Sequence, residues 1–303
     1  MVAANAKVGV AVSGGPDSLA LLLLCEAARP GRIDAATVDH GLRPESDAEA
    51  AQVAQICKSL GVPHSTLTPK WNPPPSSNVP AAARDARYAL LASWARDHGL
   101  NAVATAHHVD DQAETVLMRL ARGSGVRGLA GMSGARMLDA RVMLLRPLLN
   151  WRRSELGWIV QRAGLAAIED PTNVDPKFDR TRARALLSDA EWLDPVRLAS
   201  AASHCRDADT ALAWCAAQEF EARAQTVDAG IRIDPSGLPV ELQRRLLLIA
   251  MERLGAREPR GPDAISAVER LASRETITLG GIKMEGGDGW HLSVAAPRRN
   301  RID

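Results

Sequence analysis

The chain has 303 residues, with 37 lysine and arginine residues against 36 aspartate and glutamate residues, so its formal net charge is +1. A nearly neutral chain has no overall field that attracts a polyanion, so any nucleic-acid partner must be held by local basic patches. One tyrosine and two phenylalanines are too few for the stacking platforms of proteins that bind single-stranded nucleic acid. The length fits one large domain or two modest ones.

The cysteines and the N-terminus set further limits. Cys25, Cys57, Cys205 and Cys215 form no C-x-x-C pair, which argues against a zinc site and a disulfide scaffold. The opening letters MVAANAKVGV lack the charged-then-apolar layout of a signal peptide, and no apolar run approaches the roughly 20 residues of a membrane span. We therefore expect a cytoplasmic protein that does not insert into a membrane.

The first predicted elements are a strand at 8–12 and a leucine-rich helix, joined by the letters SGGPDS at 13–18. We call this segment the SGGPDS turn. Glycines let the backbone approach a ligand closely, and the free amides of a helix start attract phosphate, so the turn predicts a phosphate cradle. Because a carboxylate repels phosphate unless a cation bridges them, Asp17 implies Mg²⁺. The residues of the cradle are Ser13, Gly14, Gly15, Pro16, Asp17 and Ser18.

A second strand at 32–38 ends at Asp39, and a helix at 47–61 and a strand at 63–68 follow. Ligands of open α/β sheets bind at the carboxyl ends of the strands. Asp39 is therefore a candidate contact for metal or nucleotide, with a helix-capping role as the alternative.

A proline-rich loop at 69–80 leads into a helix at 79–99. Arg84 and Arg87 are three residues apart on this helix and share one of its faces. They are candidate contacts for phosphate or RNA, with a solvated helix surface as the alternative.

The stretch at 104–129, ATAHHVDDQAETVLMRLARGSGVRGL, holds most of the chemistry. A strand ends at His107 and a helix begins near Asp110, which places Asp111 and Glu114 on one helix face. Two carboxylates beside a phosphate site can hold Mg²⁺ or an ammonium group.

Other residues of this stretch have simpler alternatives. Arg122 is either a ligand contact or the basic partner of a helix C-terminus, and His108 fits a core histidine. The letters GSGVRG at 123–128 match G-x-G-x-x-G, but they follow a helix rather than a strand. We therefore reject a dinucleotide site there.

Strands and helices alternate through the first part of the chain, which predicts an α/β fold with a parallel sheet covered on both faces. After a strand at 141–146, basic residues gather in EDPTNVDPKFDRTRAR at 169–184, a pattern that can follow a phosphate backbone. The pattern then becomes mostly helical, and the end alternates around a Gly-Gly pair as in a β-hairpin. We expect one domain at 1–192 and a smaller one at 193–303.

The SGGPDS turn resembles the pyrophosphate-binding loop (PP-loop) of the N-type ATP pyrophosphatases, which split ATP between its α- and β-phosphates. Further motifs, in family order across most of the first 184 residues, resemble the tRNA(Ile)-lysidine synthetase family. A departure occurs at Thr181, where the family has asparagine. The motifs are VDHGLR, NVPAAARDARY, the stretch at 104–129, RPLL and the basic block at 169–184.

The resemblance implies a Rossmann-like adenine nucleotide α-hydrolase domain, a smaller helical tRNA-binding domain and a short β-hairpin tail. It implies ATP-dependent ligation of free L-lysine to C2 of the wobble cytidine in the CAU anticodon of minor tRNA(Ile). The product is lysidine, formed through an adenylated base with release of AMP and pyrophosphate. ATP and Mg²⁺ are the implied cofactors, and a homodimer is among the assemblies that the sequence allows.

The resemblance also implies roles for single residues. The cradle would hold the β- and γ-phosphates, with Asp17 and Asp39 at the metal. Asp111 and Glu114 would hold the lysine ammonium group or steer its deprotonation, and His107 would handle a proton or contact the nucleotide. The implied contacts for tRNA or phosphate charge are Arg84, Arg87, Arg122 and Arg180, with Arg152, Arg153, Arg244 and Arg245 as candidates for the tRNA body.

Three alternatives stay open. A PP-loop tRNA thiolase or another ATP pyrophosphatase would use the same ATP chemistry, but thiolases need paired cysteines. A metal-dependent phosphoesterase would leave the SGGPDS turn without a role. It would use Asp39, His40, His107 and His108 with Asp110 and Asp111. A non-catalytic module would bind ATP and release no pyrophosphate.

Overall fold

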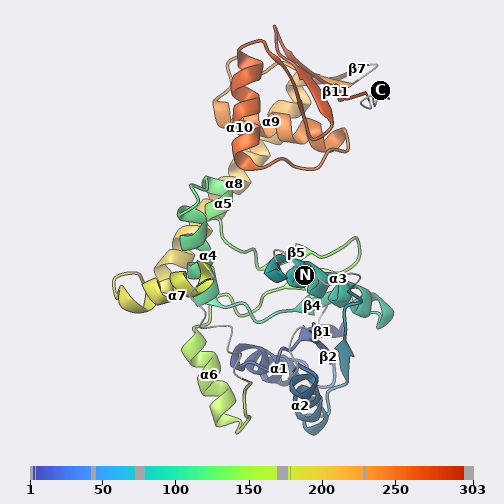
Figure 1. The fold of residues 1–303 in the computed structure, drawn as a ribbon, viewed down its shortest axis with the longest axis vertical. Helices are drawn as coiled ribbons and strands as arrows, with labels where there is room; N and C mark the ends of the chain where they lie inside the picture. The colour runs from blue at the N-terminus through green and yellow to red at the C-terminus, as the bar shows by residue number, and fades with distance from the viewer. Residues whose placement is uncertain are drawn as a thin grey trace, which may run out of the picture. The chain divides into compact units, whose positions relative to one another are not determined.

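A computed structural model describes residues 3, 5–41, 46–71, 79–168, 177, 179–227 and 230–296 (Figure 1). The chain divides into two compact units. Unit 1 comprises Met1–Gly123 and Gly128–Ser203, and unit 2 comprises Ser124–Arg127 and His204–Asp303. The units thus divide within helix α8 (Pro195–Arg223), whereas the sequence placed the division at 192/193. The assignment of catalysis to one part and tRNA binding to the other stays a prediction.

Unit 1 contains a six-stranded sheet in the order β3-β2-β1-β4-β6-β5. All neighbouring strands pair in parallel except β5, which is antiparallel to β6. This arrangement confirms the predicted α/β fold with a mostly parallel sheet. The strands are β1 (Val8–Ala11), β2 (Ile33–Val38), β3 (His64–Leu67), β4 (Ala102–Ala104), β5 (Ala135–Met137) and β6 (Met143–Leu145).

Helices follow the parallel strands, as the alternating sequence pattern predicted. No helix in the described part of the chain is both long enough and apolar enough to cross a lipid bilayer. Besides α8, the helices of unit 1 are α1 (Pro16–Ala28), α2 (Ser46–Ser59), α3 (Val79–Asp97), α4 (Val109–Leu120), α6 (Arg153–Arg162) and α7 (Asp179–Asp189), and α5 (Val126–Leu129) joins the two units.

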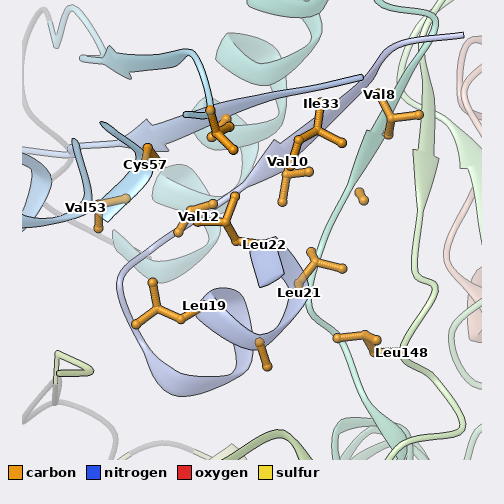
Figure 2. Packing of buried hydrophobic residues seen from close by; sticks show 14 of the residues in the cluster. Val8, Val10, Val12, Leu19, Leu21, Leu22, Ile33, Val53, Cys57 and Leu148 are labelled. Carbon is orange, nitrogen blue, oxygen red and sulfur yellow. The ribbon is translucent and has the colours of Figure 1, made fainter. Parts of the chain in front are cut away.

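The two faces of the sheet pack against different helices because side chains alternate along each strand. Val8, Val10 and Val12 point to the face covered by α1, where they meet Leu19 and Leu22 (Figure 2). On the opposite face, α3 packs through apolar side chains. These are Tyr88, Leu91, Trp94 and Ala95, which meet Ala36, Val103 and Leu144 of the sheet.

The strand order reverses at β1, and this positions the functional site. The chain runs from β1 outward to β2 and β3, then returns to place β4 on the other side of β1. In open α/β sheets, ligands bind at the carboxyl ends of the strands on either side of such a switch point. The SGGPDS turn follows β1, and His107 and His108 follow β4. The fold therefore brings the two richest sequence motifs to one place.

Unit 2 packs two helices against a five-stranded antiparallel sheet in the order β7-β8-β11-β10-β9 (Figure 1). The predicted terminal hairpin is confirmed as β9 and β10. Gly280 and Gly281 form its turn with φ of 57° and 80°, as a two-residue type I′ turn requires. The other three strands extend the hairpin into a sheet that the sequence did not predict. The elements are β7 (Ala224–Val227), β8 (Gly230–Ile233), α9 (Val240–Arg253), α10 (Gly261–Ala272), β9 (Thr276–Leu279), β10 (Ile282–Glu285) and β11 (Trp290–Val294).

A substitution at Gly9 of β1 can test the packing between the sheet and α3. A Cβ at this position would lie 2.6 Å from the Trp94 ring and 3.2 Å from Val103. We expect Gly9→Ala to lower the free energy of unfolding by about 1–3 kcal/mol, because the indole must move in a packed core. Gly134→Ala is the control, since a Cβ there meets no atom within 4 Å. Urea denaturation measures both variants, and equal stabilities would contradict this description of the core.

Candidate functional site

The SGGPDS turn is braced from within by Ser18. The Ser18 hydroxyl donates a hydrogen bond to the Gly15 carbonyl at 2.9 Å and accepts one from the Ser13 amide at 3.1 Å. The Ser13 hydroxyl also lies 3.2 Å from it. The sequence suggested Ser18 as a phosphate donor, but in the structure its proton is already directed at the Gly15 carbonyl. Ser18 thus fixes the shape of the turn.

The backbone of the turn requires glycine. Gly14 has φ of +87°, and a Cβ there would lie 2.3 Å from the Ile168 side chain. Gly15 is the N-cap of α1 and provides no side chain to cap the helix, while Pro16 occupies its first turn. The remaining first-turn amides are therefore available to an anion at the positive end of the helix dipole.

Asp17 has one oxygen that fits a cation. Its Oδ1 is buried and has no hydrogen-bond partner among the described residues, whereas its Oδ2 lies 3.4 Å from His108 Nε2. A buried carboxylate oxygen without a partner is costly, and Mg²⁺ prefers such oxygens. Within the described residues, no group of three or more His, Cys, Asp or Glu side chains could hold a metal ion. A magnesium ion at Asp17 would therefore take most of its ligands from phosphate and water.

His108 joins the turn to helix α4. It is 3% exposed, and three carboxylates surround its ring. Its Nε2 lies 3.4 Å from Asp17 Oδ2 and 3.5 Å from Asp111 Oδ2, and its Nδ1 lies 3.3 Å from Asp110 Oδ2. Burial alone would lower the pKa of His108, but these carboxylates raise it to about 10. The ring is therefore an imidazolium at neutral pH, and it attracts all three carboxylates.

Backbone amides fix two of these carboxylates further. The Arg153 amide donates to Asp110 Oδ2 at 2.9 Å, and the His108 amide donates to Asp111 Oδ2 at 3.1 Å. Burial would raise the pKa of Asp110, but the nearby His108 ring and the hydrogen bond from the Arg153 amide lower it below its usual value. Asp110 therefore stays charged, as the start of a helix favours.

Asp39 follows β2 at the same edge of the sheet. It is buried, and its Oδ1 accepts a hydrogen bond from the Gly41 amide at 2.8 Å. Burial would raise the pKa of Asp39, but the Gly41 amide and the Ser46 hydroxyl lower it below its usual value. The structure thus places Asp39 and Asp17 after neighbouring strands, β2 and β1.

His107 is neutral in this structure. Burial lowers its pKa to about 3, and three nearby guanidinium groups act in the same direction, against the carboxylate of Asp111. An imidazole with this pKa carries one ring proton, not two, near neutral pH, so it is uncharged. The guanidinium groups belong to Arg146, Arg87 and Arg180.

Glu114 is already paired with α7. It is 2% exposed, with Oε1 2.8 Å from Arg184 Nε and Oε2 2.9 Å from Arg180 Nε. Arg180 also approaches Asp111, with 3.9 Å between Nη2 and Oδ1. A buried carboxylate needs such partners. The structure therefore brings Glu114 together with Arg180, a residue that the sequence had placed at the RNA.

The other predicted arginines divide into paired and unpaired side chains. Arg122 at the end of α4 forms an ion pair with Asp179 of α7 at 2.5 Å. Arg84 and Arg87 each lie over the Tyr88 ring, 5.2 Å from its centre. Asn78 and residues 169–176 of the basic block lie outside the described residues.

Among the arginines suggested for the tRNA body, three are engaged in ion pairs. Arg152 pairs with Asp194 at 2.7 Å. Arg244 and Arg245 both pair with Glu241.

Sequence reasoning missed several contributors to the site. His108 was read as a core histidine, and Arg184 was noted only as part of a basic block. Arg146, directly after β6, was not singled out. Its position at the carboxyl end of β6, which pairs in parallel with β4, was the available signal.

The switch-point position, the lysine-free glycine turn and the acidic start of α4 define a nucleotide-binding α/β protein of the PP-loop class. A family model described as a PP-loop domain, an ATP-binding domain, matches residues 2–191. The fold is also that of the U34-tRNA thiolase NcsA from Methanococcus maripaludis, with a TM-score of 0.56 and 19% sequence identity. That comparison covers 67% of this chain and 72% of the thiolase.

Relatives at higher identity narrow the class. A tRNA(Ile)-lysidine synthase from Zymomonas mobilis is 43% identical over 302 residues, which cover 98% of this chain and 91% of the relative. One from Novosphingobium aromaticivorans is 44% identical over 299 residues, with the same two coverages. The chain belongs to the tRNA(Ile)-lysidine synthase family of enzymes, which confirms the resemblance of its motifs.

We expect His108→Gln to lower the free energy of unfolding near neutral pH. The loss should be about 2 kcal/mol, less than the roughly 3–5 kcal/mol of a fully buried pair, since the carboxylates are partly exposed. The pKa of His108 is raised from 6.5 to about 10, so its contribution is complete below pH 6.5 and is lost as the pH rises toward 10.

Urea denaturation across this pH range measures the difference between the wild type and the variant. The difference should shrink toward pH 10. His98→Gln, at the end of α3 and away from these carboxylates, is the control. A difference that stays constant with pH would contradict the charged state assigned to His108.

Proposed function

We propose that this enzyme ligates free L-lysine to C2 of the wobble cytidine in the CAU anticodon of minor tRNA(Ile), with ATP converted to AMP and pyrophosphate. The relatives' name, tRNA(Ile)-lysidine synthase, supports this activity. The observation that carries it is the contact of His108 with both Asp17 and Asp111. One buried charge thereby connects an ATP-phosphate turn with a carboxylate suited to an incoming amine.

In the first step, the cytosine C2 oxygen attacks the α-phosphorus of ATP, and pyrophosphate leaves. The SGGPDS turn would hold the β- and γ-phosphates through its backbone amides and the start of α1. Stabilising the charge on the departing pyrophosphate is the main electrostatic demand of such a transfer. Mg²⁺, held by Asp17 and Asp39 with phosphate oxygens and water, would neutralise part of this charge when bound.

In the second step, the lysine ε-amine attacks C2 and AMP leaves. The amine arrives as an ammonium group and must lose a proton before it can attack. We assign its binding to Asp111, whose Oδ1 has a single ion-pair partner among the described residues, Arg180 at 3.9 Å. Glu114 lies on the same face of α4 and adds a negative charge to the site, and it forms ion pairs with Arg180 and Arg184. His107, neutral and next to Asp111, is placed to contact the nucleotide or the base.

The RNA would be held by unit 1 arginines and by unit 2. The target base lies in a single-stranded loop, so it can be turned into the pocket at low cost. We place the reaction in the cytoplasm, where tRNA is modified. A homodimer stays a prediction.

The thiolase alternative rests on fold likeness alone. The solved structure is a thiolase with a [4Fe-4S] cluster, and such chemistry needs reactive cysteines. Burial raises the pKa of Cys25 and of Cys57 to about 11, so both are inert thiols in this structure. The cysteine chemistry therefore favours lysine over a sulfur donor.

The direct test is pyrophosphate release with a CAU-anticodon tRNA(Ile) transcript, with and without lysine, followed by mass analysis of the digested nucleosides. We expect release that depends on tRNA and a nucleoside heavier by one lysine residue. A transcript with a CAG anticodon is the control. Lysine-independent sulfur incorporation, or ATP binding without pyrophosphate release, would overturn the proposal.

Asp111→Ala tests the assigned amine site. We expect unchanged ATP affinity but at least about a hundredfold loss of lysidine formation, because the carboxylate that binds or deprotonates the amine is gone. The exposed Asp97→Ala in α3 is the matched control. ATP affinity comes from isothermal titration and lysidine from single-turnover assays. Lysidine formation at the wild-type rate would remove Asp111 from the mechanism.

A further inference from the structure

Four arginines surround the side chain of Tyr88. Arg84 and Arg87 of α3 lie over its ring at 5.2 Å from the centre, and Arg136 of β5 lies at 4.8 Å. Arg146, directly after β6, faces the Tyr88 hydroxyl. We call these five residues the Tyr88 arginine cluster.

The cluster carries buried polar atoms that lack partners. Tyr88 is 8% exposed and Arg146 is 5% exposed. Tyr88 Oη, Arg87 Nε and Arg146 Nε are buried without a well-aligned hydrogen bond. Arg146 Nη1 donates to the Ser133 carbonyl at 2.6 Å. In the part of the chain that the structure describes, none of the four arginines pairs with a carboxylate.

A buried guanidinium without a counter-charge is costly, as unit 2 illustrates by contrast. There, buried Arg245 lies 2.5 Å from Asp209 and 2.7 Å from Glu241. In the cluster, burial and mutual repulsion lower the pKa values of Arg84 and Arg146, and the Tyr88 hydroxyl offsets this only in part, with no carboxylate of the described residues beside it. The positive charge of the cluster is therefore not balanced by a carboxylate of the described residues, and a bound anion would balance it.

The position of the cluster indicates which anion this is. Arg146 follows β6, and β4 separates β6 from β1, whose end carries the SGGPDS turn. Parallel strands lie about 4.8 Å apart, so the cluster stands about two strand spacings from the ATP phosphates. His107, whose pKa the Arg87 and Arg146 charges lower, lies between the two sites. The cluster is thus on the acceptor side of the reaction, away from the triphosphate.

We propose that the Tyr88 arginine cluster binds a backbone phosphodiester of the substrate RNA adjacent to the nucleotide whose base is modified. This inference rests on the proposed function and assigns Arg136 and Arg146 to RNA binding beside Arg84 and Arg87. A phosphodiester brings one negative charge and no positive one. The carboxylate of a free amino acid would bring an α-ammonium group into a site with four cations.

The test uses the full chain and a synthetic CAU-anticodon stem-loop RNA. One version has the natural backbone, and two versions carry a neutral methylphosphonate on either side of the target cytidine. We expect one of these linkages to weaken binding to the wild type roughly tenfold, since one phosphate contact changes the salt slope by about one. The measurement is the dissociation constant as a function of salt concentration.

Arg136→Gln and Arg146→Gln should each weaken binding of the natural stem-loop by a similar factor and reduce the salt slope by about one. The same methylphosphonate should then have little further effect in these variants. The affinity for ATP and the KM for lysine should not change. Arg162→Gln is the matched control, because Arg162 lies over an aromatic ring, Trp158, at a similar distance of 5.3 Å.

The exposed Arg136→Gln keeps the test decisive if the buried Arg146→Gln does not fold. A raised KM for lysine with unchanged RNA binding would assign the cluster to the amino-acid carboxylate and overturn the inference. So would a weakened affinity for ATP, or a salt slope equal to that of the wild type. Suppose that the wild type forms lysidine, but the arginine substitutions do not change the effect of either methylphosphonate on RNA binding. This inference then fails while the proposed function stands. If it forms no lysidine, the proposed function fails whatever the binding data show.

Discussion

The buried imidazolium of His108 is the interaction on which the catalytic unit depends. Three carboxylates converge on this ring, one from the SGGPDS turn and two from the start of α4. Without the positive charge, Asp17, Asp110 and Asp111 would repel one another in a largely buried space. The charge therefore lets acids of two different functions stand side by side. It is available because the strand order reverses between β1 and β4, which brings the turn and the helix together.

Charge is balanced on one side of the site and unbalanced on the other. Glu114 is neutralised by Arg180 and Arg184, and Arg122 is paired with Asp179, so α7 lies against α4 through ion pairs. Around Tyr88 the arginines have no such partners in the described residues. A chain with a net charge of +1 can therefore present a local positive site without a basic surface overall. The nearly neutral composition predicted that a polyanion partner would be bound by a local positive charge of this kind.

The fold was largely readable from local patterns. Five apolar runs separated by helical patterns predicted the parallel sheet, because each strand and each helix has its own hydrophobic periodicity in the sequence. The Gly280–Gly281 pair predicted the terminal hairpin, since few residues other than glycine adopt the positive φ values of such a turn. The strands β5, β7 and β8 were not predicted. β5 and β7 are short and mostly exposed, so their sequences show little apolar alternation. β8 alternates between buried and exposed residues, but over only four residues.

The sequence by itself determined the PP-loop turn, the family and the identity of most charged residues near the site, because these follow from contiguous letters. Only the tertiary structure decided how the charges are paired. Asp17 lies in α1 and His108 lies at the start of α4, so they follow different strands, and Glu114 and Arg184 lie on different helices. No local spacing in the sequence indicates either contact. The Tyr88 arginine cluster likewise draws on α3, β5 and the end of β6. Whether a charged side chain is free or neutralised depends on such long-range neighbours, and sequence distance does not encode them.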